Sequence, residues 1–227
     1  MTNLDSSHSI FIVDDHPLVR EGLVNLIERQ SGLSVCGEAE KSAEAFAAIS
    51  RIKPDVAIVD LTLEGGGSGL ELIKQLQSLD QPPKVLVFSI HDEALYGERA
   101  FRAGAQGYIM KSSAPQHIIE AINQLVQGKL YMSESFAMRM AGKYISARAV
   151  PGEPPVAQLS DREMEVFRML GQGYETRYIA QKLNLSQKTV QVYCGRIKEK
   201  LSLANATELI REAVRWMESE SQGKNEM

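Results

Sequence analysis

The chain has 227 residues, of which 44% are hydrophobic, and its 25 Lys and Arg against 29 Asp and Glu give a formal net charge of −4. This length suits two domains better than one, and the acidic balance excludes a protein that coats nucleic acid with its whole surface. Any DNA contact must therefore come from a local basic patch. Two isolated cysteines, no signal-peptide pattern in residues 1–8 and no apolar run of membrane-spanning length predict a cytoplasmic protein without membrane contact.

The first half of the chain alternates β-branched runs with amphipathic stretches. Several of the runs are apolar without alternation, which is typical of strands buried on both faces. Five strand signals that are each followed by a helix signal therefore predict a parallel sheet covered by helices on both sides. The predicted strands cover residues 9–13, 33–36, 56–59, 85–88 and 107–110, and the predicted helices cover 18–29, 43–52, 69–79, 93–103 and 115–127.

The second half of the chain is helical after a break. A helix over 136–145 is predicted to be interrupted by Gly142, and prolines at 151, 154 and 155 place a linker at about 147–157. Beyond it, Ser160 and Glu163 form the pattern of a capping box for a first helix. Further helices are expected over 176–183, 186–201 and 205–217, and the polar tail 219–227 is expected to be disordered.

Polar side chains follow four of the predicted strands at the point where each strand ends. Asp14 and Asp15 follow the first strand and Asp60 follows the third, while Ser89 and Lys111 end the fourth and fifth runs. Because the carboxyl ends of parallel strands meet at one edge of a sheet, the three carboxylates should converge there. A hard cation such as Mg²⁺ relieves their repulsion. A hydroxyl, an ammonium and a metal around one carboxylate suit phosphoryl transfer to it, and Asp60 is the natural nucleophile.

Each of these residues also has an ordinary structural interpretation. Asp14 and Asp15 could cap a helix that begins near Pro17, Asp60 could be a turn residue, and Lys111 could be solvated, while Ser89 could cap the helix that follows it. Compatible chemistry at four strand ends together favours the functional interpretation.

A family resemblance rests on these motifs. They are IVDDHP at 12–17, PDV at 54–56 before Asp60, Ser89, and GAQGY at 104–108 before Lys111. In order and spacing they resemble a response-regulator receiver domain over about residues 8–130. The resemblance implies an α/β fold with a doubly wound five-stranded parallel sheet in the order 2-1-3-4-5, and it makes Asp60 the phosphoacceptor.

The resemblance also implies roles for the surrounding residues. The implied Mg²⁺ ligands are the carboxylates of Asp15 and Asp60 and the backbone carbonyl of Thr62, with Asp14 acting through a water. Lys111 would pair with the phosphoryl group, Ser89 would move to hydrogen-bond it, and Tyr108 would be the aromatic switch residue. Capping of the sheet edge is the alternative role for Tyr108.

The sequence departs from the receiver pattern in the loops around the expected site. Glu64 stands where a proline is frequent, and the glycines at 65–67 follow it. Ile90 is bulky where a small residue is common, and Ser112 replaces a frequent proline after Lys111. We expect Glu64, the glycine loop and Ile90 to affect metal affinity, access or phosphoryl lifetime, but no departure removes a catalytic group.

The region 157–218 carries a second resemblance. The motifs LSDREMEV at 159–166, GQG at 171–173, IAQKL at 179–183, LSQKTV at 185–190 and RIKEKL at 196–201 resemble a LuxR-type helix-turn-helix. With the receiver, they resemble the NarL/FixJ class of response regulators. The expected domains are therefore a receiver over 8–130, a partly helical linker over 131–157, an all-α four-helix DNA-binding domain over 158–218 and the tail.

The predicted helix over 186–201 carries four basic residues against one acid, inside an acidic protein. Such a helix can enter a major groove. By resemblance, Gln191, Val192 and Gly195 face the bases, and Lys188, Thr189 and Arg196 contact phosphates. Gly195 departs from the family by offering no side chain, so base preference stays open. A protein-binding helical bundle is the alternative, since basic helices are often just solvated.

These observations predict a transcriptional regulator that a sensor histidine kinase switches by Mg²⁺-dependent phosphorylation of Asp60. Phosphorylation would alter dimerisation and promoter binding, with a homodimer on DNA and RNA polymerase as a further partner. The expected chemistry is limited to autophosphorylation and slow autodephosphorylation, so we do not predict an enzyme. Two rivals are a phosphoaspartate hydrolase whose turnover is the function and a DNA binder that is independent of phosphorylation.

Overall fold

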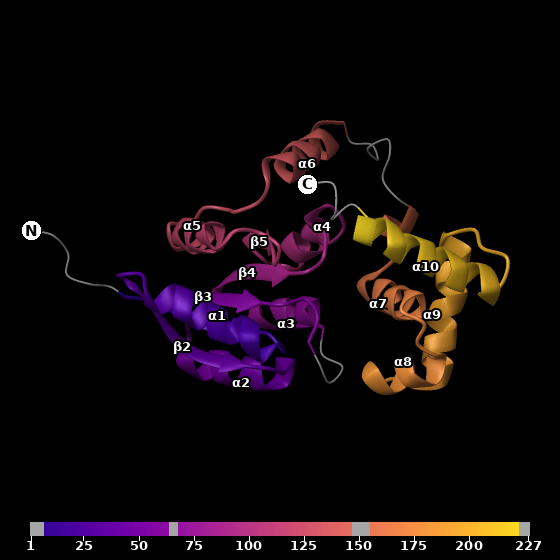
Figure 1. Cartoon of the computed structure of the whole chain (residues 1–227), viewed down its shortest axis with the longest axis horizontal. Helices are drawn as coiled ribbons and strands as arrows, with labels where there is room; N and C mark the ends of the chain where they lie inside the picture. Colours follow the sequence, from indigo (N-terminus) through magenta and orange to yellow (C-terminus); the bar gives the residue numbers. More distant parts are fainter. Residues whose placement is uncertain (1–6, 64–67, 147–154, 223–227) are drawn as a thin grey trace, which may run out of the picture. The chain divides into compact units, whose positions relative to one another are not determined.

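The computed structural model describes residues 7–63, 68–146 and 155–222 and divides into two compact units (Figure 1). The first unit covers Met1–Ile145 and the second covers Ser146–Met227. Among the described residues, no helix combines the length and the apolar composition needed to cross a membrane.

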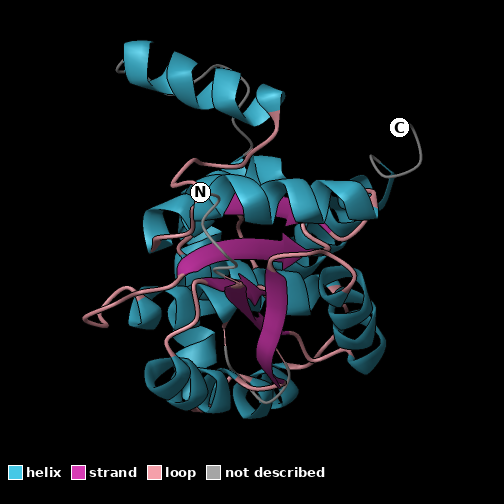
Figure 2. Cartoon of the chain, turned by 90° about the vertical axis from the view of Figure 1, so that its left-hand side faces the viewer, coloured by secondary structure: helices cyan, strands magenta, loops and turns pink. Residues whose placement is uncertain are grey.

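The first unit contains a five-stranded parallel sheet in the order β2-β1-β3-β4-β5, which confirms the predicted topology. Its strands lie between helices on both sides (Figure 2). β2 continues beyond its predicted end, alongside β1, with a register shift between Ile10 and Phe11. The strands are β1 His8–Val13, β2 Leu33–Ala39, β3 Val56–Val59, β4 Lys84–Ser89 and β5 Gly107–Met110.

Helices follow the strands in the predicted alternation. One apolar cluster joins buried residues of α1 and α5 to strand side chains such as Ile10, Ile58 and Phe88. On the other face α2, α3 and α4 pack in sequence, because α3 contacts both of its neighbours. The helices are α1 Pro17–Glu28, α2 Ser42–Ile52, α3 Gly69–Leu76, α4 Glu93–Ala103 and α5 Pro115–Val126.

A further helix, α6 Glu134–Ser146, follows the receiver-like part of the first unit. The prediction that Gly142 interrupts it is wrong, because the helix runs through this position. Open space surrounds the position that a Cβ of Gly142 would take. A glycine inside a helix costs only about 1 kcal/mol relative to alanine, which does not end a helix by itself.

The second unit is built of helices around a small apolar core that includes Phe167, Ile197 and Ala213. Ser160 and Glu163 form the predicted capping box of α7, and the Ser186 side chain accepts a hydrogen bond from the Thr189 amide at the start of α9. α10 extends beyond the predicted end at 217. The elements are η1 Pro155–Gln158, α7 Asp161–Gly171, α8 Thr176–Lys182, α9 Gln187–Lys200 and α10 Ala206–Gln222.

Candidate functional site

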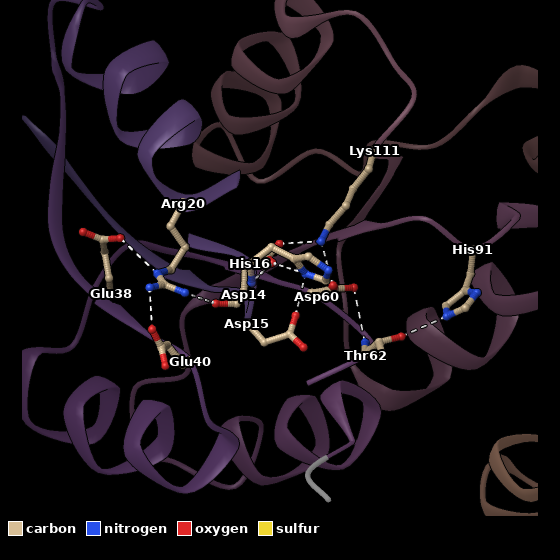
Figure 3. A network of polar contacts seen from close by, with 10 residues as sticks. All are labelled: Asp14, Asp15, His16, Arg20, Glu38, Glu40, Asp60, Thr62, His91 and Lys111. Atoms are coloured by element: carbon tan, nitrogen blue, oxygen red, sulfur yellow. Dashed lines mark hydrogen bonds and ion pairs between the residues drawn. The ribbon is translucent and has the colours of Figure 1, made fainter. Parts of the chain in front are cut away.

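The carboxyl ends of β1 and β3 bring the predicted carboxylates together (Figure 3). Asp14, Asp15 and Asp60, with the neighbouring His16, each offer a ligand atom, and these atoms all lie within 4.8 Å of one another. The Asp14 and Asp60 residues are only 1% and 2% exposed. Parallel pairing places the two strand ends side by side, so the convergence follows directly from the sheet topology.

Asp14 and Asp15 do not cap α1. The N-cap residue of α1 is His16, which makes no side-chain capping bond, and the amide of His16 donates to Asp14 Oδ1 at 2.9 Å. Pro17 occupies the start of the helix, where its missing N–H is tolerated. The Asp15 side chain is 8% exposed, and its buried Oδ1 accepts no hydrogen bond of good geometry from a described residue, although His16 Nδ1 lies 2.7 Å away. A buried carboxylate oxygen without an N–H or O–H donor is the chemistry that a hard cation fits.

Lys111 supplies the positive charge of the pocket. Its Nζ lies 2.7 Å from Asp60 Oδ2 and 2.6 Å from Asp14 Oδ2. Its amide also donates to the Ser89 carbonyl at 2.7 Å, which ties the end of β5 to the end of β4. The solvated role considered for Lys111 is therefore wrong.

Burial shifts the pKa values of both Asp60 and Lys111. Removal from water raises the pKa of Asp60, and the nearby Asp14 charge adds to this, against the opposing charge and hydrogen bond of Lys111. Burial alone would lower the pKa of Lys111, but attraction to Asp60 and Asp14 raises it, so the ammonium stays charged. Three carboxylates thus face one ammonium group in the pocket, and this excess of negative charge favours an added cation.

Ser89 ends β4, and the Tyr108 side chain on β5 lies beside it. Ser89 is fully buried, and its hydroxyl oxygen accepts a hydrogen bond from the His91 amide at 3.3 Å. The Tyr108 hydroxyl donates to the His91 carbonyl at 3.0 Å, and burial raises the pKa of this tyrosine well above its usual value. Ser89 does not cap α4, because Asp92 occupies the N-cap and accepts from the Ala94 amide. Tyr108 lies on β5 at the edge of the sheet and is only 2% exposed.

Thr62, in the loop after Asp60, contacts both Asp60 and His91. Its amide donates to Asp60 Oδ1 at 3.2 Å, and its hydroxyl lies 3.0 Å from His91 Nε2 (Figure 3). Ile90, between Ser89 and His91, is 49% exposed. Glu64 and the glycines at 65–67 lie outside the described residues.

Gly69 lets the loop return close to Asp60. A Cβ at this position would lie 2.1 Å from the Asp60 carbonyl oxygen and 2.7 Å from the Leu61 Cα. The Gly69 amide donates to the Leu61 carbonyl at 3.0 Å. Backbone packed this closely requires glycine, so Gly69 sets the path of the chain beside Asp60.

A second polar network beside the pocket was not predicted from the sequence. Arg20 on α1 donates to the Asp14 carbonyl at 2.7 Å and pairs with Glu40 at 2.7 Å and Glu38 at 3.3 Å (Figure 3). It therefore fixes the turn that presents Asp14. The contacts of His16 and His91 were not predicted either. His16 and His91 stand close to Asp14, Asp15 and Ser89 in the sequence, and His91 also contacts Thr62 and Tyr108 of other elements.

The predicted DNA-contact residues share the outer side of α9. Lys188, Gln191, Val192 and Arg196 are exposed, whereas Val190 and Ile197 on the opposite side are fully buried. The other two predicted contact residues, Thr189 and Gly195, are half-buried. Thr189 Oγ1 lies 2.7 Å from the Ser186 hydroxyl, and the Cβ position of Gly195 faces open space.

One basic residue of α9 has a structural partner instead. Lys200 Nζ lies 2.6 Å from Glu163 Oε2 and donates to the Gln158 carbonyl at 3.1 Å. Its charge therefore ties the end of α9 to the start of α7, which lowers the charge available to DNA. A stacked pair of half-exposed rings, Tyr174 and Tyr178 with centroids 4.6 Å apart, lies at the start of α8 and was also not predicted.

Family comparisons agree with this architecture. The model of the response regulator receiver domain matches residues 10–123, and the model of the luxR family of bacterial regulatory proteins matches residues 157–213. The fold and the two matches define a response regulator with a receiver domain and a LuxR-type DNA-binding domain. The chain belongs to the NarL/FixJ class of these regulators.

Relatives cover nearly the whole chain. It is 33% identical over 207 residues to the response regulator UvrY of Escherichia coli K12, covering 91% of this chain and 94% of UvrY. It is 34% identical over 206 residues to the response regulator GacA of Pseudomonas aeruginosa PAO1, covering 91% and 95%. Among solved structures, RcsB of Salmonella enterica serovar Typhimurium, bound to the promoter P1flhDC with the phosphomimetic BeF3⁻, has a TM-score of 0.67 at 26% identity, covering 92% and 98%.

Proposed function

We propose that a sensor histidine kinase transfers a phosphoryl group to Asp60 and that this modification changes dimerisation and promoter occupancy. The observation that carries the proposal is the Lys111 ammonium, which lies 2.7 Å from Asp60 and 2.6 Å from Asp14 at the carboxyl edge of the sheet. A fixed cation at this place stabilises charge on the oxygens of a phosphoryl group in transfer. RNA polymerase is a further partner in this proposal, since the DNA sites are promoters.

The transfer is a displacement at phosphorus. A carboxylate oxygen of Asp60 forms the new P–O bond while the P–N bond of the donor phosphohistidine breaks, and the leaving imidazole takes up a proton. Lys111 then pairs with a phosphoryl oxygen, and the Ser89 hydroxyl donates to another. The residues that would hold Mg²⁺ are Asp15, Asp60, the Thr62 carbonyl and, through a water, Asp14. The ion would supply positive charge against the phosphoryl oxygens.

The DNA-binding role rests on the outer side of α9. Lys188 and Arg196 would neutralise phosphates, and Gln191 and Val192 would reach base edges in the major groove. On α10 the exposed side chains of Ile210 and Val214 lie four residues apart, whereas Leu209 and Ala213 are buried in the unit. This exposed pair is the part of α10 that would join two copies on DNA.

Intact-mass measurement tests the phosphoacceptor. The full chain is incubated with Mg²⁺ and acetyl phosphate, and we expect one phosphoryl adduct on the wild type and none on Asp60→Ala. No adduct on the wild type would favour the phosphorylation-independent DNA binder. Multiple turnover of ordinary phosphoesters by the wild type would favour the hydrolase.

DNA footprinting with and without acetyl phosphate tests the output. We expect Lys188→Ala to weaken binding to all sequences and to lower the salt slope by about 1, and Gln191→Ala to relax preference at one base pair. An unchanged salt slope for Lys188→Ala would show that its ammonium does not contact a phosphate.

A further inference from the structure

The linker helix α6 is packed on α4 of the receiver through an aromatic contact. The Phe136 side chain on α6 is 3% exposed, and its ring stacks on Phe101 of α4 with centroids 5.6 Å apart. Beside it, a Cβ on Gly97 would lie 2.7 Å from the Phe136 ring. The ring therefore occupies space that only a glycine leaves on this face of α4.

Polar contacts fix the two ends of the same interface. At the start of α6, the Ser133 amide donates to Glu93 Oε1 at 3.1 Å, and Glu93 is itself buried in the first turn of α4. Near the other end, Lys143 Nζ lies 2.6 Å from Glu98 Oε2. Burial would raise the pKa of Glu98, but the hydrogen bond and charge of Lys143 and the charges of two arginines hold it below its usual value. The contacts thus extend from the first turn of α4 to Phe101.

The start of α4 is in turn held by the switch residues. The His91 amide donates to Ser89, and its carbonyl accepts from Tyr108. The His91 ring stacks on Tyr96 of α4 with centroids 4.6 Å apart. The position of α4 therefore depends on where the Ser89 and Tyr108 hydroxyl groups point.

We propose that the contact between α4 and α6 is a clasp that phosphorylation opens. The clasp comprises Glu93, Gly97, Glu98 and Phe101 on the α4 side and Ser133, Phe136 and Lys143 on the α6 side. The inference rests on the proposed phosphorylation of Asp60. When the Ser89 hydroxyl turns to a phosphoryl oxygen, it gives up the His91 amide, and the start of α4 shifts. A ring fitted over a glycine tolerates little displacement, because packed surfaces switch between discrete arrangements.

Opening of the clasp would act on the second unit through the chain itself. α6 is the last described element of the first unit, and the chain continues from it into the DNA-binding unit. With α6 held on α4, the second unit is attached to the receiver at the end of α6. With α6 released, the point of attachment moves to before residue 134, so the DNA-binding units of two copies can reach paired sites over a wider range.

Hydrogen exchange on the full chain tests the clasp. A short deuterium pulse is applied with Mg²⁺, with and without acetyl phosphate, while intact mass records the adduct. We expect the amides of 134–146 to exchange at least about tenfold faster in the phosphorylated wild type and to be unchanged in Asp60→Ala. An adduct with unchanged exchange in α6 would overturn the clasp alone, whereas no adduct would overturn the proposed function and the clasp together.

Variants of the clasp provide a second test without a phosphodonor. We expect Gly97→Ala and Phe136→Ala to speed exchange in α6 to the phosphorylated level. The matched controls are Gly22→Ala, whose Cβ would meet open space, and Met138→Ala, whose side chain is 71% exposed on α6; both should behave as the wild type. Lys143→Gln should also speed exchange in α6, because it removes the ammonium that pairs with Glu98. If the α6 amides of both Gly97→Ala and Phe136→Ala exchange at the wild-type rate, the clasp is refuted.

Discussion

Glu163 joins the start of α7 to the end of α9 in the DNA-binding unit, and its removal should destabilise that unit. Its Oε2 accepts from the Ser160 amide at 2.7 Å and lies 2.6 Å from Lys200 Nζ. The Glu163 side chain is 3% exposed, whereas that of Lys200 is 38% exposed. The change Glu163→Ala removes both the reciprocal half of the capping box and the tie between α7 and α9.

The magnitude follows from these two contacts. Loss of the capping interaction costs about 1 kcal/mol, and the ion pair, discounted for the exposure of Lys200, costs about 0.5–1 kcal/mol more. The total of about 1.5–2 kcal/mol should lower the Tm of a unit of this size by about 6–16 °C. Glu163→Gln keeps the oxygen that accepts from Ser160 and loses the charge, so we expect about half of the effect.

Trp216 is a specific reporter for this unfolding. It is the single tryptophan of the chain and packs against Phe167 in the second unit, with ring centroids 5.8 Å apart. Fluorescence-detected urea unfolding of the full chain therefore follows the DNA-binding unit. Equal midpoints for the wild type and Glu163→Ala at pH 7 would refute the assignment.

The pH dependence of the same variant has a definite sign. Burial would raise the pKa of Glu163, but its hydrogen bonds with Lys200 and Ser160 and the Lys200 charge hold it below the usual glutamate value. Because the folded-state pKa is depressed, the contribution is fully present above the unfolded-state pKa and is lost as the pH falls through the folded value. The difference between wild type and Glu163→Gln should therefore shrink under acid conditions, and a constant difference would contradict the ion pair.

Three further changes follow from the structure. Gly195→Ala should stabilise the second unit by roughly 0.5–1 kcal/mol, measured by the Trp216 midpoint, because its Cβ meets open space inside a helix. Gly69→Ala should slow acetyl phosphate labelling of Asp60 at least about tenfold, an added barrier of about 1.4 kcal/mol, because its Cβ would displace backbone of the nucleophile loop. Ile210→Asp should abolish dimerisation on DNA in sedimentation experiments while it changes stability by less than about 0.5 kcal/mol, because the side chain is 47% exposed.

The alternation of strands and helices could be predicted from local patterns, because apolar runs followed by amphipathic stretches determine it. The order of the strands came from the family resemblance, and that order places the end of β1 with Asp14 beside the end of β3 with Asp60. Lys111 could be placed for the same reason, since it follows a strand of the same sheet. Helix ends were less predictable, as α10 shows, because propensity changes gradually along a polar segment.

Contacts between elements could not be predicted in the same way. Arg20 reaches Glu38 and Glu40 across two elements, and nothing in its own helix marks it as more than a surface residue. Lys200 was counted with the basic residues of α9, because its partner in α7 lies 37 positions earlier in the chain. The docking of Phe136 was missed because the stretch around it has the weak pattern of a linker, and Gly97 carries no side chain to reveal the fit.

DNA binding by this acidic protein should depend on dimerisation, because few side chains of each DNA-binding unit are proposed to contact phosphates. Lys200 of α9 pairs with Glu163, whereas Lys188, Thr189 and Arg196 are the proposed phosphate contacts of each unit. Binding strength gained from phosphates grows with the number of contacts, so a single unit with few of them binds weakly at physiological salt. Pairing two units on one duplex doubles these contacts and makes the second binding step intramolecular. A switch that controls pairing therefore controls occupancy more steeply than one that alters any single contact in α9.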